Sequence, residues 1–226
     1  VFAGLVSLLW PLATLYSFEY MKHENHERVF FTFYVITYGV TLGIATSANI
    51  LSMYFFYELL TLVTTPLVLH TLKREAVLAA RTYLYYSIGG AAFAFIGMIF
   101  VIIYGSTTDF IYGGVMDVNP YTGNVNLLLF IYVLAFMGFG VKAAVCPFCA
   151  WLPQAGVAPT PVTALLHAVA VVKSGAFAIM RLTYYSFGTD FLKGTWAQYT
   201  VMGVTIFTIV FGCSMAVRER HIKRRL

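Results

Sequence analysis

Four titratable side chains lie within long apolar runs of the sequence: Glu58, Lys142, His167 and Lys173. A charged side chain at the centre of a bilayer is costly unless it is paired, hydrated or neutral, and such residues mark ion pathways and proton relays. We therefore expect these four residues to form a buried path for protons or cations. The sequence predicts no cofactor site and no metal site in this chain.

Glu58 and Lys142 are the expected ion pair. Glu58 is the only carboxylate within an apolar span, and an ionised carboxylate there needs one of the two available cations, Lys142 or Lys173. Burial and a nearby carboxylate act in opposite directions on the charge of Lys142, so a small change in its surroundings can decide whether it holds a proton. Two structural alternatives remain: a protonated Glu58 bonded to a helix carbonyl, and a Lys142 that reaches water at a break in its helix.

His167 and Lys173 are expected on the next helix. Six residues of ideal helix correspond to about 9 Å of rise and about 240° of rotation, so the two side chains should not share a face. This spacing favours consecutive stations over a single site. For His167 the alternative is a neutral ring bonded to a backbone carbonyl.

The segment 146–163 contains four of the seven prolines of the chain, at positions 147, 153, 159 and 161. The ring of Pro147 would collide with the carbonyl of Ala143, so the helix is expected to open beside Lys142. A broken helix at membrane depth is tolerated only against protein or a wet cavity. The same segment contains Cys146 and Cys149, and the alternative function is a membrane thiol oxidoreductase that uses these two thiols with a quinone.

The elements that must position these residues are membrane helices. The chain has 226 residues, of which 60% are hydrophobic and 10% charged, and its mean hydropathy is +0.81. A spanning helix needs about 20 apolar residues, which predicts an all-α polytopic bundle that forms one transmembrane domain over 1–226. The expected spans are 1–17, 30–47, 50–70, 82–104, 127–150, 162–180 and 197–217. The first is expected to be a partial helix, and the sequence to be a fragment.

Basic residues are concentrated in alternate connections. Under the positive-inside rule, loops 18–29, 71–81 and 218–226 are expected on the cytoplasmic side of the bilayer. The same pattern makes nucleic acid an unexpected partner, because the bases flank membrane spans and form no separate basic face. Ten of the 14 Lys and Arg residues lie in these three loops: Lys22, Arg28, Lys73, Arg74, Arg81, Arg218, Arg220, Lys223, Arg224 and Arg225.

The order of these features resembles the antiporter-like subunits shared by respiratory complex I, Mrp-type cation/proton antiporters and membrane-bound energy-converting hydrogenases. Three positions depart from the pattern of that family: Tyr57 stands where tryptophan is usual, Cys149 where histidine is frequent, and Gln154 where aspartate is frequent. The matching motifs run through about residues 50–180: Tyr57-Glu58-Leu59-Leu60-Thr61-Leu62, Gly140-Val141-Lys142-Ala143-Ala144 with Pro147, Trp151-Leu152-Pro153, Ala158-Pro159-Thr160-Pro161-Val162 and Ala164-Leu165-Leu166-His167.

The resemblance implies a fold of two inverted five-helix repeats, each with one broken helix. The first repeat would cover about 30–180, with its broken helix near 127–160, and 197–217 would begin the second. It further implies that Glu58 and Lys142 form a coupled pair and that His167 and Lys173 pass protons toward the membrane centre.

The resemblance also implies a setting for the chain. It would be a cofactor-free subunit of a hetero-oligomeric complex in a prokaryotic cytoplasmic membrane, with other membrane subunits and a peripheral redox arm as partners. A third reading is a non-pumping scaffold subunit in which the charges are structural pairs.

Overall fold

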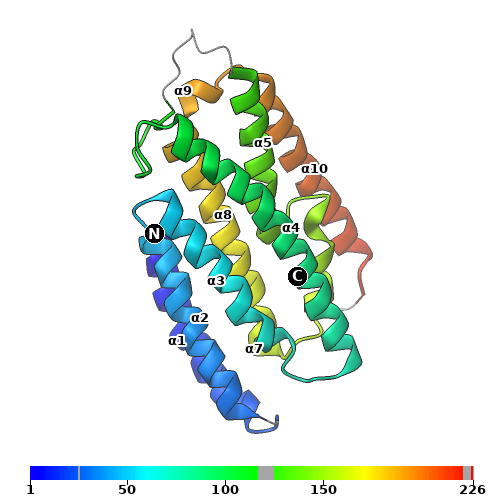
Figure 1. The fold of residues 1–226 in the computed structure, drawn as a ribbon. Helices are drawn as coiled ribbons and strands as arrows, with labels where there is room; N and C mark the ends of the chain where they lie inside the picture. The colour runs from blue at the N-terminus through cyan, green and yellow to red at the C-terminus, as the bar shows by residue number, and fades with distance from the viewer. Residues whose placement is uncertain (25, 117–124, 221–224, 226) are drawn as a thin grey trace.

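The structure is a computed structural model that describes residues 1–24, 26–116, 125–220 and 225. Its long elements are all helices (Figure 1). Short 3₁₀ and π segments, named η, join some of them. In chain order they are α1 (Phe2–Met21), α2 (Glu27–Thr46), α3 (Ile50–Val68), α4 (Arg74–Tyr104), α5 (Val125–Lys142), η2 (Phe148–Ala150), α6 (Trp151–Ala155), α7 (Thr160–Ala164), η3 (Leu165–Val169), α8 (Val171–Arg181), η4 (Leu182–Phe187), α9 (Thr189–Leu192) and α10 (Trp196–Arg218).

Seven helical segments among the described residues are long and apolar enough to cross a membrane. They are α1 to α5, the nearly continuous segment Thr160–Phe187, and α10. The predicted all-α membrane bundle is confirmed. The first helix is longer than the predicted span 1–17, because α1 runs from Phe2 to Met21 and its 20 residues are enough to span.

Two of the predicted loops are shorter than expected. The connection placed at 18–29 is reduced to 22–26, and α4 begins at Arg74, so most of 71–81 is helix. The physical reason lies in the residues after Lys73, since arginine, alanine and leucine are good helix formers and Glu75 lies favourably in the first turn. Apolarity predicts the part of a helix inside the bilayer and misses the polar turns that extend beyond it.

Of the predicted connection 105–126, the structure describes residues 105–116 and the first two residues of α5, 125 and 126. There it turns back at Gly113 and Gly114, whose φ angles are +103° and +100°, and only glycine adopts such angles easily. The amide of Val115 donates to Ser186 O at 2.9 Å, and the amide of Phe110 donates to Ala48 O at 3.0 Å. This hairpin therefore ties the end of η4 to the start of α3. The turn residues expected at 119–120 and 123–124 lie outside the described residues, as do 221–224 and 226 of the basic C-terminal segment.

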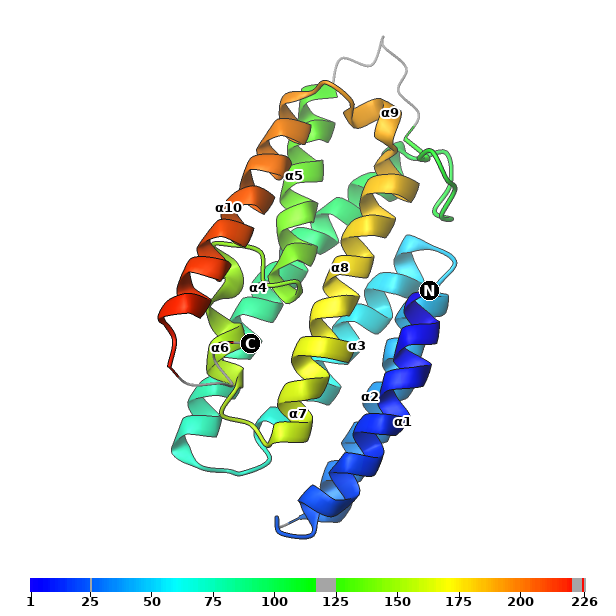
Figure 2. The same cartoon turned by 180° about the vertical axis from the view of Figure 1, so that it is seen from behind.

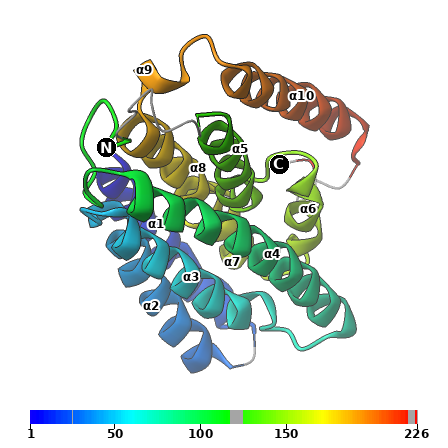
Figure 3. The ribbon, with the colours of Figure 1, turned by 45° about the horizontal axis from the view of Figure 1, so that its top comes forward.

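The interior of the bundle lies between α3, α4, α5 and α8, and small residues let the helices approach closely. A Cβ added at Gly97 of α4 would collide with Ala135 of α5, and one added at Gly90 would meet Val141 at 2.7 Å. Such contacts are typical of membrane helix packing. Helix α10 lies at the edge of the bundle beside α5 (Figure 3), and Ala197 is its only buried residue.

Candidate functional site

Helix α5 ends at Lys142, beside the predicted opening. Ala144 takes a left-handed conformation with φ of +57°, and the chain then runs through an irregular segment to η2 and α6. The carbonyl of Val141 accepts from the amide of Ala144 at 3.1 Å and from the indole Nε1 of Trp151 at 2.8 Å. The buried carbonyl of Val141, at the end of the helix, therefore has hydrogen-bond donors within the protein and needs no water.

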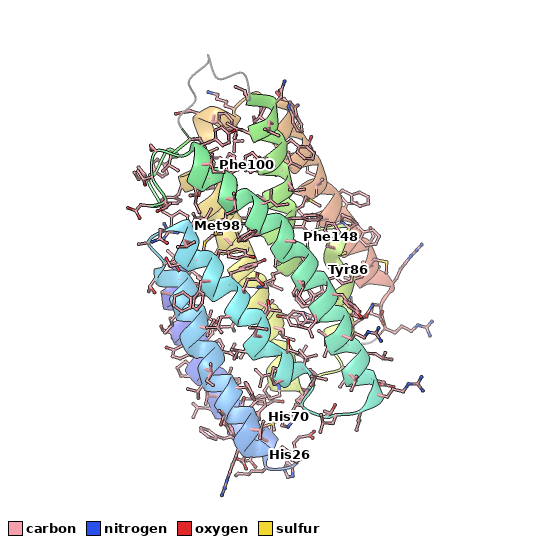
Figure 4. The ribbon with its side chains drawn as sticks, viewed as in Figure 1. His26, His70, Tyr86, Met98, Phe100 and Phe148 are labelled. Atoms are coloured by element: carbon pink, nitrogen blue, oxygen red, sulfur yellow. The ribbon has the colours of Figure 1, made fainter. Side chains whose placement is uncertain are left out.

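Trp151 holds the two sides of the break together. Its side chain is fully buried, and its ring lies 5.1 Å from the ring of Tyr83 on α4. The ring of Phe148, in η2, lies 6.5 Å from that of Tyr86, also on α4 (Figure 4). The broken segment is thus packed against α4 through aromatic contacts. The Trp-Leu-Pro motif has a structural role that the sequence did not reveal.

Lys142 is 1% exposed and has three partners, all on α3. Its Nζ lies 3.8 Å from Oε1 of Glu58 and 3.4 Å from the centre of the Tyr57 ring, and it donates to the backbone carbonyl of Tyr57. The structure thus brings together Glu58 and Lys142, which lie on helices far apart in the sequence. The ammonium is also near the C-terminal end of α5, where the helix dipole favours a positive charge.

Tyr57 is a site residue that the sequence reasoning missed. Its hydroxyl donates to the carbonyl of Phe139 at 3.0 Å, and the two rings lie edge to face with centres 5.1 Å apart. Tyr57 therefore locks α3 against α5 one turn before Lys142 while it covers the ammonium. Its position directly before Glu58 is the available signal in the sequence, where Tyr57 otherwise stands out only as a departure from the family pattern.

Glu58 is less enclosed than its partner, with 29% of its side chain exposed. Its Oε1 is nevertheless buried and has no hydrogen-bond partner among the described residues. The alternative in which this oxygen binds a helix carbonyl is therefore absent from the described contacts. The Glu58–Lys142 contact is an ion pair in which one carboxylate oxygen is otherwise unsatisfied.

A group of buried hydroxyl side chains continues from Glu58 along α3 and α4. Thr61 follows Glu58 by one helical turn, and Thr64 Oγ1 lies 2.8 Å from the hydroxyl of Tyr83. Thr61, Thr64, Tyr83 and Ser87 are each at most 2% exposed. Hydroxyls both donate and accept, so this cluster offers polar contacts beside the pair in an otherwise apolar interior.

His167 lies in the π segment η3 at some distance along the chain from the pair. Its ring is beside the backbone carbonyl of Leu152, while its Nε2 is buried and has no partner among the described residues. The rise and rotation expected between His167 and Lys173 assume an ideal α-helix, and this assumption is wrong. The amide of Ala170 donates to Leu165 O at 2.8 Å, which is a π-type hydrogen bond and adds a residue to this turn.

Lys173 differs from Lys142 in its surroundings. It lies on α8, its side chain is exposed, and it lines a groove of about 580 Å³ between α1 and α8. No hydrogen bond or ion pair to Lys173 occurs within the described part of the chain. Two residues further, Gly175 packs so closely on α5 that an added Cβ would collide with the amide of Ala143. Helix α8 therefore contacts the break with one face and presents Lys173 on another.

These features define a class of membrane protein: a helical bundle with a lysine–glutamate pair at the end of an interrupted helix. The chain belongs to the NADH:quinone oxidoreductase/Mrp antiporter transmembrane family, whose sequence profile matches residues 47–226.

Curated relatives come from two kinds of complex. A Na⁺/H⁺ antiporter subunit from Alkalihalophilus pseudofirmus is 31% identical over 226 residues, which is 99% of this chain and 27% of that protein. Subunit 5 of the chloroplast NAD(P)H-quinone oxidoreductase of Lobularia maritima is 29% identical over 98% of this chain and 30% of that protein. The chain therefore spans less than a third of the length of these relatives.

Solved structures share the fold. A chain of the archaeal membrane-bound sulfane sulfur reductase has a TM-score of 0.80 at 21% identity, with 99% of this chain and 46% of that chain covered. A chain of respiratory complex I from Thermus thermophilus has a TM-score of 0.73 at 23% identity, with 99% and 47% covered. At these identities the likeness establishes the fold alone.

Proposed function

We propose that this chain is a proton- or cation-translocating membrane subunit of a redox-driven ion pump or of a multisubunit cation/proton antiporter. The observation that carries the proposal is the Glu58–Lys142 pair, with an ammonium that is 1% exposed and 3.8 Å from a carboxylate oxygen. An ion pair with one fully buried partner is weak as a stabilising device, because the loss of hydration offsets much of the attraction. A role in moving charge gives a reason for its presence.

The pair works as a switch in this proposal. Lys142 holds its proton while Glu58 is close, and it releases the proton when the two separate. Tyr57 keeps the deprotonated or protonated amine in place during this change, because its carbonyl and ring contact Nζ independently of Glu58. The unsatisfied oxygen of Glu58 supports such movement, since no hydrogen bond among the described residues fixes it.

The pair is connected to one route that supplies protons and to one that takes them away. His167 and Lys173 would receive protons on the far side of the break, and the buried Nε2 of His167 is free to accept one. The hydroxyl cluster of Thr61, Thr64 and Tyr83 would supply protons to Glu58 from the other side. The chain itself would hold no redox cofactor and would be driven by a neighbouring electron-transfer module or by an ion gradient.

The proposed partners and membrane of this chain are based on its relatives, which are named as subunits of antiporters and oxidoreductases. We propose that the chain assembles with other membrane subunits, and with a peripheral redox arm if its complex is an oxidoreductase, in a prokaryotic cytoplasmic membrane. Connections 22–26 and 69–73 lie at one end of the bundle and the 105–116 hairpin at the other (Figure 1). This arrangement and the basic residues at that end support a cytoplasmic location for loops 18–29 and 71–81, and we propose the same side for 218–226 from its basic residues.

The test is Lys142→Ala in the assembled complex, reconstituted in proteoliposomes. We expect assembly to persist and ion translocation to be abolished, with proton and sodium fluxes recorded separately to identify the ion. The control is Lys193→Ala, which removes an exposed lysine on the connection before α10 and should leave translocation unchanged. Normal translocation by Lys142→Ala would overturn the proposal. A Glu58→Gln, Lys142→Met double variant that assembles and still pumps would instead favour the scaffold function.

A further inference from the structure

Cys146 and Cys149 lie in the broken segment between α5 and α6 and take no part in the proposed path. Cys146 is buried, and Cys149 is the middle residue of η2. The thiol of Cys149 lies within hydrogen-bonding reach of the thiol of Cys146. This contact is made entirely within the chain, so it does not depend on what covers the segment from outside. Two thiols in contact can be joined by a disulfide with little movement of the backbone.

The surroundings favour a disulfide over a bound metal ion at this pair of thiols. Two thiolates around a soft monovalent cation carry a net negative charge, and a divalent ion needs further ligands. No group of three or more His, Cys, Asp or Glu side chains suited to a metal occurs in the described part of the chain. A disulfide is neutral and apolar, so its formation adds no charge at membrane depth.

The pair of thiols lies where a crosslink would affect Lys142. Cys146 follows Lys142, the last residue of α5, by four positions. The amide of Cys146 donates to Oγ1 of Thr208 on α10 at 3.0 Å, and in the view from behind the connection passes next to α10 before α6 begins (Figure 2). On the other side, η2 leads directly into Trp151, whose indole donates to Val141 O. A bond between the two sulfurs would therefore join the part of the segment held by α10 to the part held by Trp151, and would restrict movement at the end of α5.

We infer that Cys146 and Cys149 form a reversible oxidation site, at which a peroxide closes a disulfide across the break and thereby slows proton or cation transfer at Lys142. The site regulates transport and is not part of the transport chemistry, which distinguishes it from a thiol oxidoreductase whose thiols turn over with substrate. Its effect on transfer rests on the proposed function, in which Lys142 must separate from Glu58. Formation of the disulfide itself does not.

Hydrogen peroxide supplies the oxidising equivalents, and it is small and uncharged, so it can reach a site at membrane depth. One thiol sulfur attacks a peroxide oxygen, the O–O bond breaks, and a sulfenic acid and one water form. The second sulfur then attacks the sulfenic sulfur, the S–S bond forms, and a second water leaves. The two sulfurs are oxidised, the peroxide is reduced, and both thiol protons end in water. A thiol reductant reverses the change by exchange.

Mass spectrometry tests the bond in the complete complex in its native membrane. Membranes are treated with hydrogen peroxide, free thiols are then alkylated with N-ethylmaleimide, and the peptide that contains both cysteines is analysed. We expect this peptide to be unalkylated and lighter by two hydrogens after peroxide, and doubly alkylated after further treatment with dithiothreitol. Cys213, a free cysteine on α10, is the internal control and should remain alkylated. Absence of a link between positions 146 and 149 would overturn the inference.

Translocation in proteoliposomes tests the effect of the disulfide. Peroxide should slow translocation by the unmodified complex by about tenfold, and dithiothreitol should restore the rate. Cys146→Ser and Cys149→Ser should each translocate normally before treatment and lose the sensitivity, whereas the matched Cys213→Ser variant should keep it. A disulfide that forms without slowing translocation, or equal sensitivity in Cys149→Ser, would overturn the inference. Loss of translocation in Lys142→Ala together with either result would uphold the proposed function and reject the inference alone.

Discussion

A double-mutant cycle at Glu58 and Lys142 measures whether the two charges act as one unit. The cycle compares Glu58→Gln, Lys142→Met and the double variant with the unmodified complex. At the observed separation of 3.8 Å, two unit charges attract by about 4 kcal/mol at an effective dielectric constant of about 20. Because 29% of Glu58 is exposed, solvent screens part of this attraction, and we expect a coupling free energy of about 2 to 4 kcal/mol.

The assay is reversible unfolding of the purified complex in mixed micelles, with each variant measured under identical conditions. Each single substitution should lower the free energy of unfolding, because it leaves one charge buried without its partner. The double variant should be destabilised by less than the sum of the singles, with the coupling energy as the difference. Strictly additive losses would mean that the two charges do not interact. That result would refute the proposal that the pair works as a switch.

Two further substitutions test the surroundings of the pair. Gly175→Leu should prevent assembly, because even a Cβ at this position collides with the backbone of Ala143, whereas Gly203→Ala on α10 has open space and should assemble normally, as seen by native gel electrophoresis. Thr64→Val keeps the shape of the side chain and removes its contact with the Tyr83 hydroxyl at 2.8 Å; it should slow translocation in proteoliposomes while it lowers stability by only about 1 kcal/mol. An unchanged rate in Thr64→Val would exclude the hydroxyl cluster from the path.

The pair and the break were accessible from sequence for simple reasons. Only one carboxylate lies within the apolar spans, so a buried lysine had few possible partners. Pro147 cannot continue a helix, so the end of α5 near Lys142 followed from the position of that residue alone. These predictions depend on single residues whose chemistry leaves little choice, and they do not require knowledge of helix packing.

The surroundings of the site depended on information that the sequence does not carry. Lys173 lies between Val172 and Ser174 in a run that is apolar on most sides, so hydrophobic periodicity could not tell which face is covered. The extra residue in the turn at Ala170 is a backbone feature with no side-chain signature. The role of Tyr57 arises from contact with Phe139, 82 residues away, which only the packing of α3 on α5 creates.

Lys142 and Lys173 look alike in sequence, yet they differ in whether their charge has partners within the chain. The charge of Lys142 is met within the chain by Glu58 and by the carbonyl and ring of Tyr57. No hydrogen bond or ion pair to Lys173 occurs among the described residues, so at membrane depth this lysine must be neutral, hydrated or paired with a group beyond them. In the proposed path, the protonation of Lys142 is therefore governed by contacts within the chain, whereas the protonation of Lys173 depends on the surroundings that the complete complex provides.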